Sequence, residues 1–563
     1  MRTDHYIFSI KSGVWEVISG NLEVSTKGEV TTYSGQLSSK EIEMVFSHYK
    51  DGTLPKYLDT LTNPEFILFV CDKSTGTFVV ANDKFGNNEI YYISQDNGFF
   101  VSNSLQALFL RVGIEPEIDL IGAYELLSFL TILPPRTIYK GASALSVGRI
   151  LTYNNGDTTT ARYWDLERRL ADKVIDYEAH VEKYREVFRE TVAEEAEGSI
   201  AVALSGGIDS GGILGVLTDI KKAPVPSISV GPQGKDSHDL VSARKTVAHF
   251  ASPNVERYPD ISLLALLKEV ASTITQPIGG EVIISYAMLY REAKNLGYEK
   301  LFFGSGTQLL LGNLKSAQFE YKTRYYERFI PRFILNPLYR LYAWHKGFSE
   351  NRVAYMTART WRERFGYAKG ALFTRERYLY KALPKDFFDT VTAHLTSIEQ
   401  SPLNRSDAFV VMEVNSWVEC QQQKDGHALA RLFGIKPVSP FNTPRVGEYM
   451  LRTTDEMRRR NNWKKQLIRD MFKPFVPEHL YTRDGNSLLV PYTAMLEEKR
   501  KELLTYLQGN KLIQKIIDME VYERDYHTLP EPGLSLIRLT SLALWYDAHH
   551  DEEHLKQFDV VIK

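Results

Sequence analysis

A glycine-rich turn is the part of this sequence whose residue types and spacing most clearly indicate chemistry. The apolar run IAVAL (residues 200–204) leads directly into SGGIDSGG (residues 205–212), which opens a helix-like segment. At a turn from strand to helix, unpaired backbone N–H groups and the positive end of the helix dipole point at one spot. Glycines let the backbone approach phosphate oxygens closely. The pattern therefore predicts a phosphate-binding loop.

The polar residues of this loop indicate which phosphate chemistry it serves. Ser205 and Ser210 add hydroxyl donors beside Gly206 and Gly207. Asp209 is unexpected there, because a carboxylate repels phosphate unless a cation lies between them. We therefore predict Mg²⁺ between Asp209 and a polyphosphate.

The loop lacks the Gly-Lys-Ser/Thr ending that holds the β- and γ-phosphates in kinases and GTPases. It resembles the pyrophosphate loop of N-type ATP pyrophosphatases, which cleave ATP between its α- and β-phosphates and leave AMP on the substrate. The alternative is that a glycine-rich turn only makes a tight connection between a strand and a helix.

The elements around the loop indicate an α/β architecture. Strand-like runs at residues 200–204, 227–230 and 301–303 alternate with helical segments, which is typical of a doubly wound parallel sheet. Beyond residue 315 helical periodicity dominates. Before residue 166 the chain shows short β-rich runs, among them residues 67–70, 77–80 and 98–101, which predict a layered β domain. An amphipathic helix over residues 177–195 places a domain boundary near residues 166–176.

Bulk composition excludes several classes of protein. A chain of 563 residues is too long for one hydrophobic core. Its 68 basic and 70 acidic residues give a net charge of −2, so we expect no general attraction to nucleic acid or membrane. No apolar run approaches a signal sequence or membrane span, which predicts a cytoplasmic protein. Two cysteines, Cys71 and Cys420, make no disulfide framework.

Several motifs now carry a family resemblance. In the first half these are DKFG (residues 83–86), FVSNSLQAL (residues 100–108), PRTIYKG (residues 135–141) and RYWD (residues 162–165). With the loop they make most of the chain resemble asparagine synthetases and their relatives, the β-lactam synthetases and lasso-peptide cyclases. The resemblance implies a glutaminase-like αββα sandwich over residues 1–168. It also implies an ATP-pyrophosphatase domain with a doubly wound parallel sheet and a helical C-terminal part over residues 177–563.

The front domain departs from that family at its nucleophile. In asparagine synthetases the fold begins with a cysteine directly after the initiator methionine, whose thiolate attacks the glutamine amide. Position 2 is Arg2 here, and Cys71 and Cys420 are internal to the chain. We therefore expect a structural or docking domain that does not hydrolyse glutamine.

Resemblance also assigns residues around the loop. Leu204 and the loop residues Ser205, Gly206, Gly207, Asp209 and Ser210 are expected to bind ATP. So are Val230, in the segment that flanks adenine, and Gly304, in the motif GSGTQ (residues 304–308). Gln308 stands where the family has a second metal-binding aspartate and offers a weaker, neutral oxygen ligand. Ser305 stands where β-lactam synthetases carry a tyrosine base, which counts against that chemistry.

A lysine near the C-terminal third completes the predicted site. The segment KQLIR (residues 465–469) resembles a family motif whose lysine neutralises charge on the α-phosphate. We assign this catalytic role to Lys465, together with Asp209. Lys464 is a neighbouring rival, and a solvated basic face over residues 458–465 is the structural alternative. Residues 440–442 resemble an architectural turn.

The resemblance implies an ATP- and Mg²⁺-dependent ligase that adenylates a carboxylate and couples it to an amine. Without a glutaminase cysteine, an amine tethered within the substrate gains a high effective concentration, which suits macrolactam closure. A lasso-peptide cyclase is therefore the leading hypothesis, with a precursor peptide as substrate and a leader-binding protein and leader protease as partners. The alternatives are amidation of a small carboxylate by ammonia, and a scaffold protein with impaired catalysis.

Overall fold

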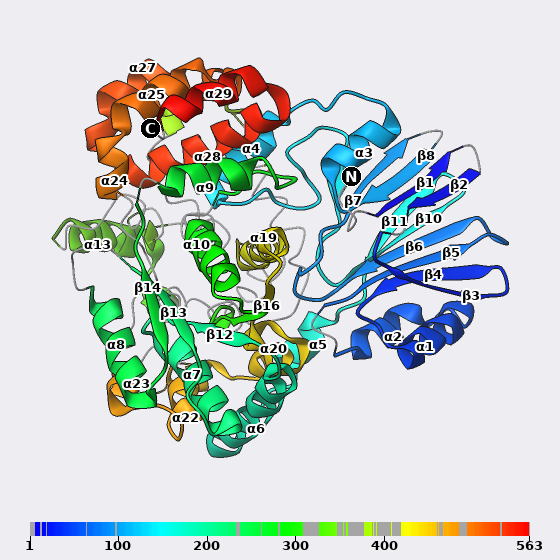
Figure 1. The fold of residues 1–563 in the computed structure, drawn as a ribbon, viewed down its shortest axis with the longest axis horizontal. Coiled ribbons are helices and arrows are strands. Elements are labelled where there is room, and N and C mark those ends of the chain that lie inside the picture. Colours follow the sequence, from blue (N-terminus) through cyan, green and yellow to red (C-terminus); the bar gives the residue numbers. More distant parts are fainter. Residues whose placement is uncertain are drawn as a thin grey trace.

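The computed structural model describes most of the chain. Described are residues 6–561 except 12–13, 19, 63–64, 96–97, 232–236, 261, 280–281, 308–325, 346–352, 354–355, 358–376, 386, 388–389, 391–406, 408–417, 459, 461–464, 483–492 and 530–531. Two domains lie side by side, a β-rich one from the first 165 residues and a larger α/β one (Figure 1).

The front domain is a sandwich of two sheets between helices. One sheet has the strand order β2-β1-β8-β7-β9 and the other β11-β10-β6-β5-β4-β3, all in antiparallel pairs. Their bounds are β1 Ile7–Lys11, β2 Val14–Ile18, β3 Glu23–Lys27, β4 Val30–Gly35, β5 Ile67–Asp72, β6 Thr77–Asn82, β7 Tyr91–Gln95, β8 Gly98–Ser102, β9 Ser143–Ala144, β10 Arg149–Asn154 and β11 Asp157–Arg162.

Helices cover both outer faces of this sandwich. Side chains alternate across a strand, so Phe69 of β5 joins the core between the sheets while Leu68 and Val70 pack towards the first helices. On β8, Phe100 likewise faces outward to the opposite helix layer. The helices are α1 Ser39–Lys50, α2 Leu54–Thr60, α3 Leu105–Val112 and α4 Leu120–Phe129. The predicted αββα sandwich is confirmed.

A helical connection leads into the second domain. Helix α5 (Leu166–Ala171) lies within the predicted boundary, and α6 (Tyr177–Glu195) has the predicted bounds. Asp176 caps α6 by accepting a hydrogen bond from the Ala179 backbone N–H at 2.8 Å. Buried residues Val181, Tyr184 and Phe188 recur every three or four positions and face the core.

The second domain is built on a five-stranded parallel sheet with the order β14-β13-β12-β15-β16. Because both faces are covered, alternate residues of the central strand enter different cores: Ala201 on one face, Val202 on the other. The strands are β12 Ile200–Ala203, β13 Ser227–Val230, β14 Asn254–Arg257, β15 Lys300–Phe302 and β16 Lys436–Val438. The expected doubly wound sheet is confirmed.

Helices of both faces position the ends of these strands. The face of the sheet that α6 covers also carries α7 Ile208–Lys221, α20 Pro444–Leu451 and α22 Gln466–Phe472. The opposite face carries α9 Ser262–Ala271, α10 Val282–Asn295 and α19 Val418–Phe433. Helix α8 (His238–Phe250) packs against α7, as does α23 (Glu478–Thr482).

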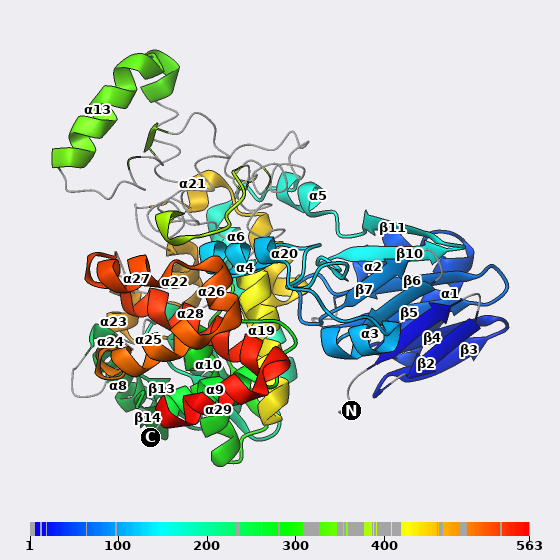
Figure 2. The same cartoon turned by 90° about the horizontal axis from the view of Figure 1, so that it is seen from above.

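The C-terminal part is helical, as expected. It comprises α24 Thr493–Glu498, α25 Arg500–Gly509, α26 Lys511–Ile516, α27 Met519–Asp525, α28 Pro532–His550 and α29 Glu552–Val561, with α28 packed against α9. Seen from above, α13 (Arg332–His345) stands away from the rest of the molecule (Figure 2). Among the described helices, none combines the length and apolar character needed to cross a membrane.

Candidate active site

The predicted phosphate loop follows the central strand. Residues 204–207 join β12 to α7, so the loop lies at the carboxyl end of the parallel sheet and at a helix N-terminus. Gly206 has a φ of +77°, and a Cβ there would lie 2.1 Å from the Asp239 carbonyl oxygen. The Ser242 hydroxyl donates to the Gly206 carbonyl at 2.7 Å. Only glycine fits this contact, which fixes the loop against α8.

The two serine hydroxyls predicted to bind phosphate are within hydrogen-bond distance of each other. Oγ of Ser205 and Oγ of Ser210 are 3.0 Å apart, and the Ser205 backbone N–H donates to Ser210 Oγ at 3.1 Å. The Gly207 N–H donates to Ser205 Oγ at 3.4 Å. These hydrogen bonds within the loop fix its shape. When an anion binds, the hydroxyls can donate to it in place of these internal bonds at little cost in free energy.

Neighbouring strands bring the remaining predicted residues to the same edge. Val230 is buried at the end of β13, and Leu204 accepts a hydrogen bond at its carbonyl from Ser229 Oγ at 2.8 Å. A Cβ on Gly304, just after β15, would lie 2.8 Å from the Asp209 Cβ. The strand order reverses between β12 and β15, where doubly wound folds bind ligands.

The two residues predicted to be catalytic are in direct contact. The Lys465 ammonium forms an ion pair with Oδ2 of Asp209 and donates to Oγ1 of Thr307 at 2.7 Å. The Thr307 hydroxyl also lies 3.4 Å from Asp209 Oδ2. Two elements more than 250 residues apart in sequence therefore meet at one point.

Lys465 is held in an unusual conformation. Its φ of +58° and ψ of +37° place a non-glycine residue in the left-handed region, just before α22. Such a residue persists where surrounding packing enforces it, typically at functional sites. In α22 the buried Arg469 donates to the carbonyl of Leu480 at 3.2 Å and to that of Tyr481, which anchors the helix carrying the lysine.

The other carboxylate oxygen of Asp209 suits a metal ion. Within the described part of the chain, Oδ1 of Asp209 is buried and receives no hydrogen bond. An unsatisfied buried carboxylate oxygen is costly, and a hard cation would satisfy it. Gln308, the second predicted ligand, lies outside the described residues. The described residues contain no cluster of three or more acidic, histidine or cysteine side chains that could bind a metal.

A second turn closes the site from the side of β16. The residues of η2 (Pro440–Asn442) follow β16, and Ser439 Oγ lies 3.0 Å from Ser305 Oγ. Gly306 has a φ of +105°, and a Cβ there would lie 2.0 Å from Oδ1 of Asn442. The turn therefore packs directly on the loop that presents Thr307.

The front domain offers no reactive thiol. Cys71 is its one cysteine and is the next-to-last residue of the buried strand β5. Burial raises the pKa of its thiol to about 12, so the thiol stays protonated at neutral pH.

The structure thus gathers Leu204, Ser205, Gly206, Gly207, Asp209, Ser210, Val230, Gly304 and Lys465 at one edge of the sheet; their roles with ATP stay predictions. Lys464, the rival lysine, lies outside the described residues. Sequence reasoning assigned no role to Thr307, which contacts both Asp209 and Lys465, the two residues predicted to be catalytic. Its place one residue before Gln308 in the motif is the signal that could have indicated it.

Two family profiles match the chain. Residues 183–550 match Asparagine synthase, and residues 34–164 match Glutamine amidotransferase domain. Together with the synthetase relative described below, these matches identify an ATP-dependent carbon–nitrogen ligase that forms AMP, with a glutaminase-like front domain. Since the first match spans well over half of the sequence, this chain belongs to the asparagine synthase family.

Individual relatives are distant. The chain is 20% identical to "Asparagine synthetase [glutamine-hydrolyzing] 1" of Bacillus subtilis, covering 96% of this chain and 87% of that protein. It is 25% identical to "Amidase chry2" of Gibberella zeae over 38% of this chain and 32% of that protein. An NH3-dependent NAD synthetase structure from Campylobacter jejuni shares 19% identity over 25% of this chain and 62% of its own, with a TM-score of 0.18, too low to support any conclusion.

Proposed function

We propose that this ligase closes a macrolactam within a peptide, as lasso-peptide cyclases do, and does not draw ammonia from glutamine. The observation that carries the proposal is the front domain's single cysteine, Cys71, which is buried and has a pKa of about 12. A glutaminase of this fold needs an accessible nucleophilic thiolate. With that route closed, an amine on the substrate itself is the simplest acceptor, because tethering raises its effective concentration.

In the proposed first step, a peptide carboxylate attacks the α-phosphate of ATP and releases pyrophosphate. Lys465 leaves Asp209 and neutralises negative charge on the α-phosphate as pyrophosphate departs. The N-terminal backbone N–H groups of α7, which begins directly after the loop, hold the departing phosphates. Mg²⁺, held by Asp209 and by Gln308 as predicted, would neutralise the phosphates.

In the second step the amine attacks the acyl-adenylate and AMP leaves. The same Lys465 ammonium stabilises the negative charge of the tetrahedral intermediate, so one cation serves both steps. A free amine of the same peptide then becomes the new amide nitrogen. A precursor peptide is thus the proposed substrate, with a leader-binding protein and a leader protease as proposed partners.

A second candidate is amidation of a small carboxylate by ammonia. The similarity to an asparagine synthetase over 96% of the chain supports it. The contact of Asp209, Thr307 and Lys465 argues against the third possibility, a scaffold without catalysis, because an idle site has no need for a lysine held in a left-handed conformation.

Mass spectrometry separates these possibilities. The chain is incubated with MgATP and, in parallel, with peptides bearing a free α-amine and an internal Asp or Glu, or with aspartate and ammonium. The macrolactam proposal expects AMP together with loss of one water from a peptide. Amidated aspartate alone would overturn it in favour of the second candidate, and absence of AMP with every substrate would support the scaffold.

A further inference from the structure

A buried lysine of the front domain reaches into the second domain. The Lys84 ammonium lies 2.8 Å from Oε1 of Glu448 on α20, and donates to the carbonyls of Asp59 and Leu61, each at 2.9 Å. The Lys84 side chain is 1% exposed, so this charge persists only because three acceptors surround it.

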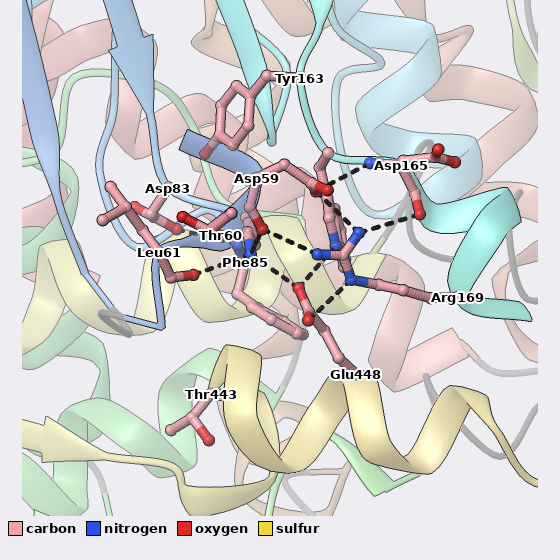
Figure 3. Close-up of polar contacts among 12 residues, drawn as sticks. Asp59, Thr60, Leu61, Asp83, Phe85, Tyr163, Asp165, Arg169, Thr443 and Glu448 are labelled. Atoms are coloured by element: carbon pink, nitrogen blue, oxygen red, sulfur yellow. Dashed lines mark hydrogen bonds and ion pairs between the residues drawn. The ribbon is translucent and has the colours of Figure 1, made fainter. Parts of the chain in front are cut away.

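The turn that carries Lys84 is itself rigid. The buried Asp83 carboxylate accepts the backbone N–H groups of Phe85 at 3.0 Å and Asn87 at 3.1 Å, and the side-chain amide of Asn88 at 3.1 Å. Figure 3 shows Asp83 and Phe85 close to Asp59 and Leu61. Lys84 is therefore a fixed donor rather than a flexible surface lysine.

Two further donors converge on the same carboxylate. Arg169 places Nε 2.7 Å from Oε2 of Glu448 and Nη1 2.8 Å from Oδ1 of Asp59. Trp164 donates its indole N–H to Oε1 of Glu448 at 3.1 Å. Figure 3 shows Glu448 rising from its helix towards Arg169. Three donors from outside the second domain's core therefore fix one glutamate of α20.

Helix α20 begins directly after the turn that closes the site. Thr443 caps α20 by accepting the Val446 N–H at 3.3 Å, and Glu448 lies about one turn further on. Immediately before Thr443 stands Asn442, on which Gly306 packs. One residue after Gly306 is Thr307, which contacts Lys465 and Asp209.

We propose that Glu448, clamped by Lys84 and Arg169, is a positioning residue for the ligase reaction. The clamp sets the position of α20, and α20 sets the position of the turn at residues 439–443 against residues 304–307. In this proposal the front domain does not supply ammonia. It instead holds Thr307 in position beside Lys465 and Asp209. This inference rests on the ligase activity and goes beyond the proposed function, since it gives the front domain a role.

The test uses the full chain with Glu448→Gln, Lys84→Met and Lys84→Arg. Release of AMP from MgATP is measured with whichever acid proves to be the substrate. Glu448→Gln and Lys84→Met are expected to lower kcat by about tenfold, the scale on which packed elements transmit coupling. The KM for ATP should stay within about twofold, since the affected contacts act on the reacting charge. Lys84→Arg keeps the cation and should retain most of the activity.

Arg168→Ala is the matched control. Arg168 pairs with Asp59 at 2.8 Å in the same cluster, but its side chain is 67% exposed and its described partners are Asp59 and Asp165. This variant should keep the wild-type kcat. Wild-type kcat in Glu448→Gln, or an equal loss in Arg168→Ala, would overturn the clamp.

Hydrogen–deuterium exchange keeps the two proposals separable. If the wild type releases no AMP, the proposed function fails while the clamp is still testable. Glu448→Gln should then exchange faster than the wild type across residues 439–451, with Arg168→Ala unchanged. Equal exchange in Glu448→Gln and the wild type would overturn the clamp, whatever the activity.

Discussion

At the scale of single residues, the ion pair between Lys465 and Asp209 brings together the two charges that the proposed reaction uses. Each charge neutralises the other, and the second oxygen of Asp209 is buried without a hydrogen bond in the described structure. A bound polyphosphate with its cation can separate this pair: the phosphate then pairs with Lys465, and the cation pairs with Asp209.

Lys465→Met removes the cation while keeping much of the side-chain volume. We expect kcat for AMP formation to fall by roughly 100-fold, as for loss of one transition-state donor. The KM for ATP should change by less than about threefold, since the cation acts on developing charge. Lys473→Met is the control and should keep full activity, because Lys473 is an exposed residue directly after the end of α22. Normal turnover by Lys465→Met would rule out its role.

Two adjacent loop glycines should respond differently to a methyl group. Gly206→Ala must place a Cβ 2.1 Å from a backbone oxygen at a φ of +77°, so denaturant titration should show a loss of about 1–3 kcal/mol. Gly207 has a φ of −88°, and its nearest neighbour would be Ser205 Oγ at 3.5 Å. Gly207→Ala should fold normally and bind ATP more weakly. Equal stability of the two variants would contradict this account of the loop.

At the scale of elements, α7 carries the loop because its glycines let it pack closely. A Cβ on Gly215 would lie 2.1 Å from the carbonyl oxygen of Phe475, and one on Gly211 would meet the end of the Leu480 side chain at 2.3 Å. A backbone oxygen cannot move aside as a leucine methyl can.

Gly215→Ala should therefore lower the free energy of unfolding by about 1–3 kcal/mol, despite the roughly 1 kcal/mol that alanine gains in helix propensity. Gly211→Ala should cost clearly less, because Leu480 can change rotamer. Thermal unfolding of both variants checks the order; a more stable Gly215→Ala would show that α7 packs less closely than the structure has it.

The sequence predicted the elements that local patterns define. The strand at residues 227–230 and the helix at residues 177–195 have the bounds expected from their apolar runs and periodicity. The edge strands β14 and β16 were not predicted, because they are three or four residues long and interrupted by polar residues or Pro437. Such strands exist only because a neighbouring strand pairs with them.

The site was predictable to a similar degree. Asp209 and the loop glycines follow from one contiguous motif, whereas the contact of Thr307 with Lys465 joins residues 158 positions apart. No local pattern encodes such a contact, which depends on how α22 packs. The clamp on Glu448 joins residues 364 positions apart and could not be predicted from the sequence for the same reason.

At the scale of the whole molecule, acid should weaken the fold through buried histidines. Burial lowers the pKa of His180 to about 4, and its Nδ1 is buried with no hydrogen-bond partner in the described structure. The unfolded chain, with a histidine pKa of about 6.5, binds more protons between pH 4 and 6.5, so stability falls as pH falls through that window.

His180→Asn removes this contribution. Its stability deficit against the wild type should shrink by about 1–3 kcal/mol when denaturant titrations are moved from pH 7 to pH 4. Both proteins share all other titrating groups, so comparing them cancels the contributions of those groups to the pH dependence of stability. One such group is Glu65, whose contribution has the opposite sign because burial raises its pKa to about 7. A deficit that grows on acidification would contradict a neutral, buried His180.

In our proposal the loop, the ion pair and the clamped turn all serve one event: transfer of a carboxylate oxygen to the α-phosphorus of ATP. Labelling the substrate carboxylate with heavy oxygen tests this event directly. The account predicts that one labelled oxygen appears in AMP for each amide formed. Unlabelled AMP, or ADP as the product, would show that the carboxylate never becomes an adenylate.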